Sequence, residues 1–74
     1  MDFEKPTLDQ LANRFTFHAP NGDQAERYER IRAQIRAAAI VVVDLTPCSP
    51  EQTRALNALD EAMFLANAAI ARNE

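Results

Sequence analysis

The 74-residue sequence has one cysteine, one glycine, one histidine and no tryptophan. A lone Cys48 cannot form an internal disulfide, and one cysteine with one histidine falls short of a structural zinc site. Helical domains of this length usually bury too little apolar surface to be stable alone. We therefore expect a homo-oligomer, with no metal ion and no cofactor.

Long apolar runs and an excess of positive charge are also missing. The most apolar stretch, residues 37–47, has about half of the roughly 20 residues that span a bilayer. The N-terminal segment is acidic and polar, unlike a signal peptide. A net charge of −3 opposes binding to long nucleic acid. These absences predict a cytoplasmic protein without a membrane partner, whose anionic ligand would be small.

Helix-start signals predict a single all-α domain over residues 1–74. Thr7 can cap a short helix at about residues 7–14, and Asp23 can cap a long helix at about residues 24–45.

A second long helix is predicted at about residues 50–73, because Ser49, Pro50 and Gln52 form an S-x-x-Q capping box with proline at the first helical position. The tight link between the two long helices predicts an antiparallel helical hairpin, preceded by the short N-terminal helix.

Apolar residues recur at spacings of three and four in both long segments, as in packed helices. The first seam is Tyr28, Ile31, Ile35, Ala38, Val42 and Leu45, and the second is Leu56, Leu59, Met63, Ala66 and Ile70. An additional apolar set lies off these seams: Ile40, Val41, Val43, Phe64 and Leu65. Either the short helix covers this set or further copies of the chain do. We favour a mixture in which most of it is an oligomer interface.

Few residues could support catalysis. His18 and Cys48 are the only nucleophile–base pair, and both lie near proline turns rather than in a nucleophile motif. Asp60 and Glu61 point about 100° apart on a helix, so they cannot act as paired carboxylates. The sequence predicts a binding protein with no catalytic residues.

Seven of the eight basic residues are arginines. Arg27 and Arg30 alternate with glutamates and are expected to pair with them on a solvated face. Arg32 and Arg36 share a face with fewer acids nearby, so they are freer to bind an anion. A guanidinium matches the geometry of a phosphate and also stacks on a base.

The stretch FTFHAPNGDQ, residues 15–24, separates the first two helices. Pro20 and the Asn21-Gly22 pair mark a turn. Phe15 and Phe17 alternate, so we expect one ring to plug the core and the other to point outward. An aromatic ring beside a guanidinium is the minimal apparatus for holding a nucleotide.

The sequence contains three recognisable segments in order: RFTFHAPNGDQAERYERIR, PCSPEQTRAL and EAMFLANAAIARNE. It resembles the small phage anti-CBASS sponge proteins of the second described family over roughly residues 14–74. The resemblance implies helical hairpins that assemble into homo-oligomers, hexamers in the described cases. It also implies that they sequester cyclic dinucleotides, and in some members cyclic trinucleotides, without cleaving them. The implied location is the cytoplasm of the infected bacterial host.

The resemblance also assigns candidate ligand-binding residues. Phe17 corresponds to a base-stacking ring that is tyrosine in the family, so a hydroxyl is lost here, and Arg32 corresponds to a basic residue expected on a phosphate. His18 fits the motif and either touches ligand or pins the turn. Arg72 matches a terminal arginine of a second, trinucleotide-type site. Phe17→Ala and Arg32→Ala should cripple dinucleotide capture, whereas Arg72→Ala should spare it.

Two other functions stay open. One is an oligomeric structural or adaptor hairpin that binds no nucleotide and is indifferent to Phe17→Ala in a binding test. The other is a regulator that binds DNA or RNA, which the net charge opposes.

Overall fold

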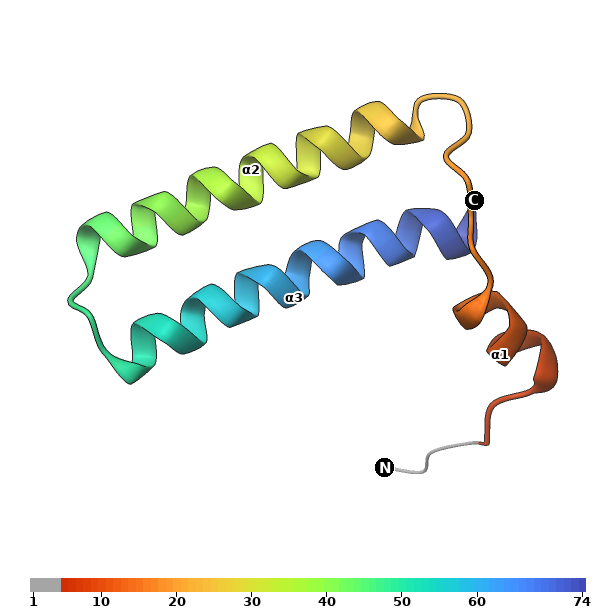
Figure 1. Cartoon of the computed structure of the whole chain (residues 1–74), viewed down its shortest axis with the longest axis horizontal. Coiled ribbons are helices and arrows are strands. Elements are labelled where there is room, and N and C mark those ends of the chain that lie inside the picture. Colours follow the sequence, from red (N-terminus) through yellow and green to blue (C-terminus); the bar gives the residue numbers. More distant parts are fainter. Residues whose placement is uncertain (1–4) are drawn as a thin grey trace.

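The computed structural model describes residues 5–74, which contain three α-helices and no strand (Figure 1). α1 spans Leu8–Phe15, α2 spans Gln24–Leu45 and α3 spans Pro50–Asn73. α2 and α3 run antiparallel on either side of a short link, so they form the hairpin that the sequence predicts. Residues 1–4, which belong to the acidic N-terminal segment, lie outside the described residues.

Side-chain caps define the starts of α1 and α3. Thr7 Oγ1 accepts a hydrogen bond from Gln10 N at 3.1 Å, and Gln10 Oε1 accepts one from Thr7 N at 2.8 Å, which completes a capping box. At α3, Ser49 Oγ accepts from Gln52 N at 3.1 Å. The Gln52 amide donates instead to Thr46, to its carbonyl oxygen at 3.1 Å and its hydroxyl at 3.0 Å. The predicted S-x-x-Q box is therefore only half formed, because the Gln52 side chain does not bond to the Ser49 backbone. It joins the start of α3 to the end of α2 instead.

The start of α2 differs from the prediction. Asp23 precedes the helix, but its side chain does not cap it. A turn closes this end instead, with Gln24 N donating to Asn21 O at 2.9 Å and Asn21 N donating to Gln24 Oε1 at 3.0 Å. Gly22 has a φ of 55°, a left-handed conformation that glycine adopts without steric cost. The single glycine of the sequence therefore serves the turn that redirects the chain into α2.

A half-buried seam joins α2 to α3. On α3 its members are Leu56, Leu59, Met63, Ala66 and Ile70, as predicted. On α2 its members are Tyr28, Ile31, Ile35, Ala39 and Val42. The prediction was wrong for Ala38 and Leu45, which are exposed, Leu45 by 78%. A strict alternation of three and four has a period of 3.5 residues, and a straight helix drifts from it by about 20° per heptad.

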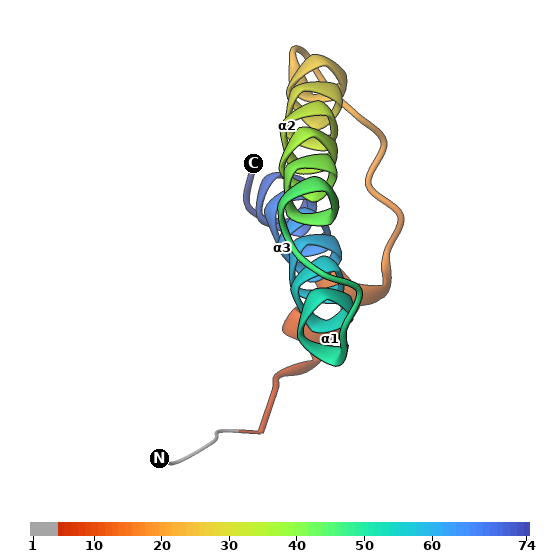
Figure 2. The same cartoon turned by 90° about the vertical axis from the view of Figure 1, so that its left-hand side faces the viewer.

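The molecule is a flat, open slab. Its Cα radius of gyration is 15.8 Å, whereas a compact domain of this length would have about 11 Å. Its shortest dimension is 17 Å, and Figure 2 shows α2 and α3 in a single layer. No hydrophobic residue among 5–74 is fully buried, and the one buried residue of that range is Gln24, which is 7% exposed. The described chain has no closed hydrophobic core.

Large hydrophobic side chains are instead exposed on all three helices and beside them. They are Leu8, Phe15, Phe17, Ile40, Val41, Val43, Leu45, Phe64 and Leu65. α1 lies beyond the end of the hairpin at which α3 finishes, so it does not cover the apolar set off the seams (Figure 1). Of the two ways to cover that set, the one that uses the short helix was wrong. Within residues 5–74, none of the helices combines the length and apolar character needed to cross a bilayer.

Candidate ligand-binding groove

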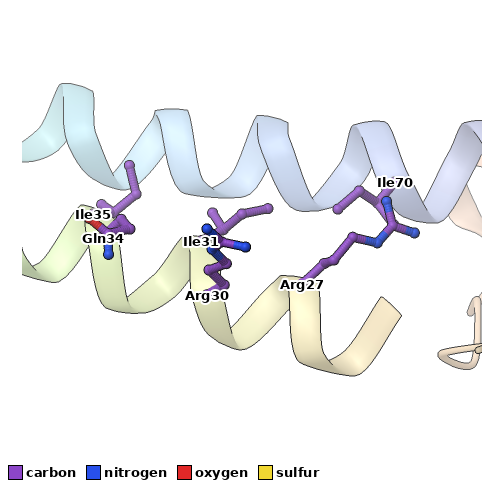
Figure 3. A pocket seen from close by; sticks show the side chains of 6 residues that line it. All are labelled: Arg27, Arg30, Ile31, Gln34, Ile35 and Ile70. Carbon is purple, nitrogen blue, oxygen red and sulfur yellow. The ribbon is translucent and has the colours of Figure 1, made fainter. Parts of the chain in front are cut away.

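Two open grooves flank the seam near the C-terminal end of α3. The first has a volume of about 480 Å³ and is lined by Arg27, Arg30, Ile31, Gln34, Ile35 and Ile70 (Figure 3). Figure 3 shows Ile31 and Ile35 pointing toward α3, so the floor of this groove is aliphatic. The charge of Arg27 is already paired with Glu74. This groove contains none of the four residues that the family resemblance singles out.

The second groove, called the Arg32 groove below, has a volume of about 370 Å³. It is lined by Arg14, Thr16, Phe17, His18, Tyr28, Arg32, Asn67, Ala68, Ala71 and Arg72. Arg30 and Arg32 point about 200° apart around α2, which puts the two grooves on opposite sides of the hairpin. The structure thus brings Phe17, His18, Arg32 and Arg72 together from three separate parts of the chain.

The 16–23 segment supplies the aromatic side of this groove. Figure 2 shows that it stands to one side of the plane of α2 and α3 as it runs from α1 to the start of α2. Phe17 lines the groove while its side chain is 86% exposed, so the ring is open to a stacking partner. Phe15 is also exposed, with the Arg14 guanidinium 5.8 Å from its ring centroid. The prediction that one ring plugs the core was wrong, because the hairpin has no closed core to plug.

His18 joins the 16–23 segment to α1. Its Nε2 lies 2.8 Å from the carbonyl oxygen of Asn13. Since a carbonyl oxygen can only accept, Nε2 must carry the hydrogen, and in the neutral ring Nδ1 remains an acceptor. The half-buried His18 ring pins the turn and also lines the Arg32 groove.

The arginines of α2 pair differently from the prediction. Arg32 Nη1 donates to Glu29 Oε1, three residues earlier on the same face, so Arg32 is not free. Arg27 pairs with Asp23 and Glu74 rather than with neighbouring glutamates of its own helix. Among residues 5–74, Arg30 and Arg36 form no ion pair within 4.0 Å. The sequence spacing predicted that Arg27 forms an ion pair, but a contact between segments far apart in the sequence determines that one of its partners is Glu74.

Arg72 has two structural contacts besides lining the groove. Its Nη2 donates to the carbonyl oxygen of Arg14 at 3.3 Å, and its own carbonyl oxygen accepts from Asn13 Nδ2 at 3.1 Å. Both contacts join α1 to the last turn of α3. The structure therefore places Arg72 beside Phe17 and Arg32 and not in a separate groove of the protomer.

Asn67 is a groove residue that the sequence reasoning missed. Its Oδ1 is buried and has no hydrogen-bond partner within residues 5–74. Buried polar atoms are nearly always paired, so an unpaired oxygen here marks a place where a donor is missing. The only local signal is a polar residue inside the alanine-rich LANAAIA stretch. Ala68 and Ala71 beside it have small side chains, which leave the groove open.

The Acb2/Tad1 hairpin-domain family matches residues 7–71 of the sequence. The chain belongs to this family. The Acb2/Tad1 family is the anti-CBASS sponge family, so the match confirms the resemblance seen in the sequence. No curated protein and no solved structure matches the chain. The family match covers every residue that lines the Arg32 groove except Arg72.

The residues that line the Arg32 groove of this Acb2/Tad1 hairpin suit the binding of a ligand. This groove is lined by three arginines, an exposed phenylalanine ring and a tyrosine, and none of the lining residues in the described part of the chain is acidic. His18 and Cys48 are not brought together, because Cys48 lies in the link at the far end of the hairpin (Figure 1). No group of three or more His, Cys, Asp or Glu side chains in residues 5–74 could hold a metal ion. Guanidinium groups beside an open ring suit a ligand that is both anionic and aromatic.

Proposed function

We propose that this Acb2/Tad1 hairpin captures cyclic oligonucleotide second messengers in the Arg32 groove and withholds them, uncleaved, from CBASS-type antiphage immunity in the cytoplasm of the infected bacterium. One observation carries the proposal. Phe17 and His18 from a loop, Arg32 from α2 and Arg72 from α3 converge on one groove, and none of its lining residues within 5–74 is acidic. A protein whose net charge is −3 thereby presents a locally basic surface.

The groove has a part for each component of a nucleotide. The exposed ring of Phe17 can stack on a base, and stacking tolerates the loss of a tyrosine hydroxyl. The guanidinium of Arg32 can pair with a phosphate after it exchanges its Glu29 contact for the ligand. The Tyr28 hydroxyl and the Asn67 amide are polar groups in the same groove that can bind a base edge.

The groove supplies only half of what a cyclic dinucleotide needs. Its volume of about 370 Å³ is near the low end for ligand pockets. It presents one open ring to a ligand that has two bases and two phosphates. A cyclic dinucleotide is nearly twofold symmetric, and a twofold dimer would place two copies of the groove around it. We propose a site shared between two protomers.

Self-association of the chain also fits its surface. Among residues 5–74, nine large hydrophobic side chains are exposed and no hydrophobic residue is fully buried. A chain of this size without a closed core needs a partner to bury apolar surface. We propose a homo-oligomer, and the family resemblance makes a hexamer the expected assembly. The separate site for cyclic trinucleotides would also belong to that assembly.

A calorimetric titration with cyclic GMP-AMP, followed by recovery of the ligand after denaturation, tests the proposed function. We expect about one ligand per two chains, returned intact. Phe17→Ala and Arg32→Ala should each weaken capture about tenfold or more, because one stacking or one charge-assisted contact is lost. The assembly should stay intact in both variants.

The chain offers matched controls for both substitutions. Phe15 is nearly as exposed as Phe17 but does not line the Arg32 groove. Arg36, one turn beyond Arg32, lines an adjacent groove that Arg32 also borders, but it does not line the Arg32 groove itself. Phe15→Ala and Arg36→Ala should leave capture unchanged. If no cyclic dinucleotide or trinucleotide binds the wild-type chain, the oligomeric adaptor becomes the better account. If Phe17→Ala or Arg32→Ala dissolves the assembly, those residues are structural.

A further inference from the structure

The 16–23 segment, which carries Phe17 and His18, has little hydrophobic support. Every residue of the segment except His18 is exposed. The position of the Phe17 ring must therefore depend on polar contacts at the two ends of the segment. Contacts at both ends lead to the C-terminal end of α3, to Arg72 in its last turn and to Glu74 directly after it.

The first end of the segment is tied to α3 through α1. His18 Nε2 donates to the carbonyl oxygen of Asn13, and the side-chain amide of Asn13 donates to the carbonyl oxygen of Arg72 at 3.1 Å. The Arg72 guanidinium returns a hydrogen bond to the Arg14 carbonyl oxygen at 3.3 Å. These contacts fix where the segment starts.

The second end is tied to α3 by Glu74. The Glu74 carboxylate accepts from both terminal nitrogens of Arg27, with Nη1 at 2.7 Å, and from Gln24 Nε2 at 3.2 Å. Arg27 also holds Asp23 Oδ1 at 3.2 Å through Nε. Gln24 uses its other amide atom, Oε1, to accept from Asn21 N at 3.0 Å. The carboxylate of Glu74 is thus linked, through two side chains, to both sides of the Gly22 turn.

These contacts keep the Glu74 carboxylate charged. The hydrogen bond from Arg27, followed by that from Gln24, lowers the pKa of Glu74 to about 2. Gln24, which joins Glu74 to the turn, is the buried residue of the described chain. A charged acceptor beside a buried amide is well suited to hold one geometry.

We propose that Glu74 is a positioning residue for the ligand-binding groove: through Gln24 and Arg27 it holds the turn at residues 21–23 and so sets the position of the Phe17 ring. Glu74 does not line the Arg32 groove, so it acts through the segment and not on the ligand. Its effect on ligand capture rests on the proposed function. Its effect on the order of the segment does not.

Loss of the Glu74 contacts lowers the fraction of molecules in which the Phe17 ring is in place. The apparent dissociation constant rises in inverse proportion to that fraction. The α1 contacts remain, so the segment is loosened at one end only and capture is weakened without being abolished.

The test compares the full chain with Glu74→Ala, Glu74→Gln and the control Glu61→Ala, which removes an exposed carboxylate of α3 instead of the one that follows it. Amide hydrogen exchange of residues 16–24 is measured without ligand, and cyclic GMP-AMP affinity is measured by calorimetry. Glu74→Ala should speed exchange in residues 16–24 and weaken affinity about tenfold, while exchange in the middle of α2 and α3 stays unchanged. Glu74→Gln keeps one acceptor oxygen and should show a smaller change in both measurements. Glu61→Ala should match the wild type.

Three results would overturn the proposal. One is unchanged exchange of residues 16–24 in Glu74→Ala, and another is faster exchange throughout α2 and α3, which would make Glu74 a general structural residue. The third is faster exchange of the segment with unaltered affinity, since the segment's position would then not matter to the groove. If the wild-type chain binds no cyclic nucleotide, the proposed function fails, and the exchange comparison still decides whether Glu74 places the segment.

Discussion

At the scale of single residues, Glu29 competes with the proposed ligand for Arg32. Its carboxylate accepts from the guanidinium that a phosphate would need. Both side chains are largely exposed, Arg32 by 53% and Glu29 by 73%, and such pairs contribute at most about 1 kcal/mol. Glu29 therefore orients Arg32 at the edge of the groove, and breaking this ion pair to bind a phosphate costs little free energy.

Glu29→Gln should tighten capture of a cyclic dinucleotide by about two- to fivefold, because the ligand then displaces a neutral amide instead of a carboxylate. Calorimetric titration at low salt measures the change. Glu26→Gln removes the same charge from a residue that forms no ion pair within residues 5–74, so it serves as the matched control. Equal tightening in both variants would attribute the effect to bulk charge and not to Arg32.

Arg72 is the residue for which the structure favours a different outcome from the sequence. From the family resemblance, Arg72→Ala should spare dinucleotide capture. Its place in the Arg32 groove and its hydrogen bond to Arg14 O lead us to expect about fivefold weaker capture. Arg54→Ala, at the other end of α3, is the control. Capture equal to wild type in Arg72→Ala would assign the arginine to a separate site, as the resemblance suggests.

At the scale of elements, the ion pair of Arg27 and Glu74 joins the first turn of α2 to the C-terminal end of α3. The hydrogen bond from Arg27, followed by that from Gln24, lowers the pKa of Glu74 from 4.5 to about 2, and the pKa of Arg27 is raised in turn, chiefly by the hydrogen bond to Glu74. A carboxylate with a depressed pKa in the folded state stabilises that state fully above its unfolded pKa of 4.5. This contribution is lost as pH falls from 4.5 through about 2.

Glu74→Gln should therefore flatten the dependence of unfolding free energy on pH between 4.5 and about 2. Urea unfolding followed by circular dichroism at several pH values measures this dependence. Above pH 4.5 the variant should be less stable than the wild type by an amount that no longer changes with pH. The same slope in both proteins below pH 4.5 would show that the ion pair does not persist in solution.

At the scale of the whole molecule, the open slab favours the proposed homo-oligomer. Phe64 is 66% exposed in the middle of α3, and Ile40, Val41, Val43 and Leu65 are also at least half exposed. Surface of this kind is unusual on a monomer and typical of a protein interface. The proposed site needs the same assembly, since the groove of each protomer offers one exposed aromatic ring, that of Phe17, to a ligand with two bases.

Phe64→Glu should dissociate the assembly, because a carboxylate would have to be buried without a partner at an apolar interface. Light scattering coupled to size-exclusion chromatography gives the mass. Thermal stability and ligand capture should fall together with the mass of the Phe64→Glu variant. Thr53→Glu adds the same charge at an exposed polar position of α3 and should leave the mass unchanged. An unchanged mass for Phe64→Glu would place the interface elsewhere.

The sequence alone determined the helices and their approximate ends, because caps, prolines and apolar periodicity act within a few residues of each other. Thr7, Pro50 and the Asn21-Gly22 turn are signals of this kind, and the structure has helix starts and a turn where they predict them. The quoted motifs also identified the family. Phe17, His18, Arg32 and Arg72 could be selected from the sequence for the same reason, since they stand in those motifs.

Tertiary structure decided what these residues meet. Arg27 pairs with Glu74, forty-seven positions away, and no local rule predicts a contact over that separation. Ala39 takes the place in the seam that was predicted for Ala38, because an α-helix has 3.6 residues per turn and not the 3.5 of a heptad pattern. Asn67 and the single groove shared by Phe17, Arg32 and Arg72 emerged only when α1, α2 and α3 were placed in space. Local free energies shape the elements, whereas the contacts between their ends build the site.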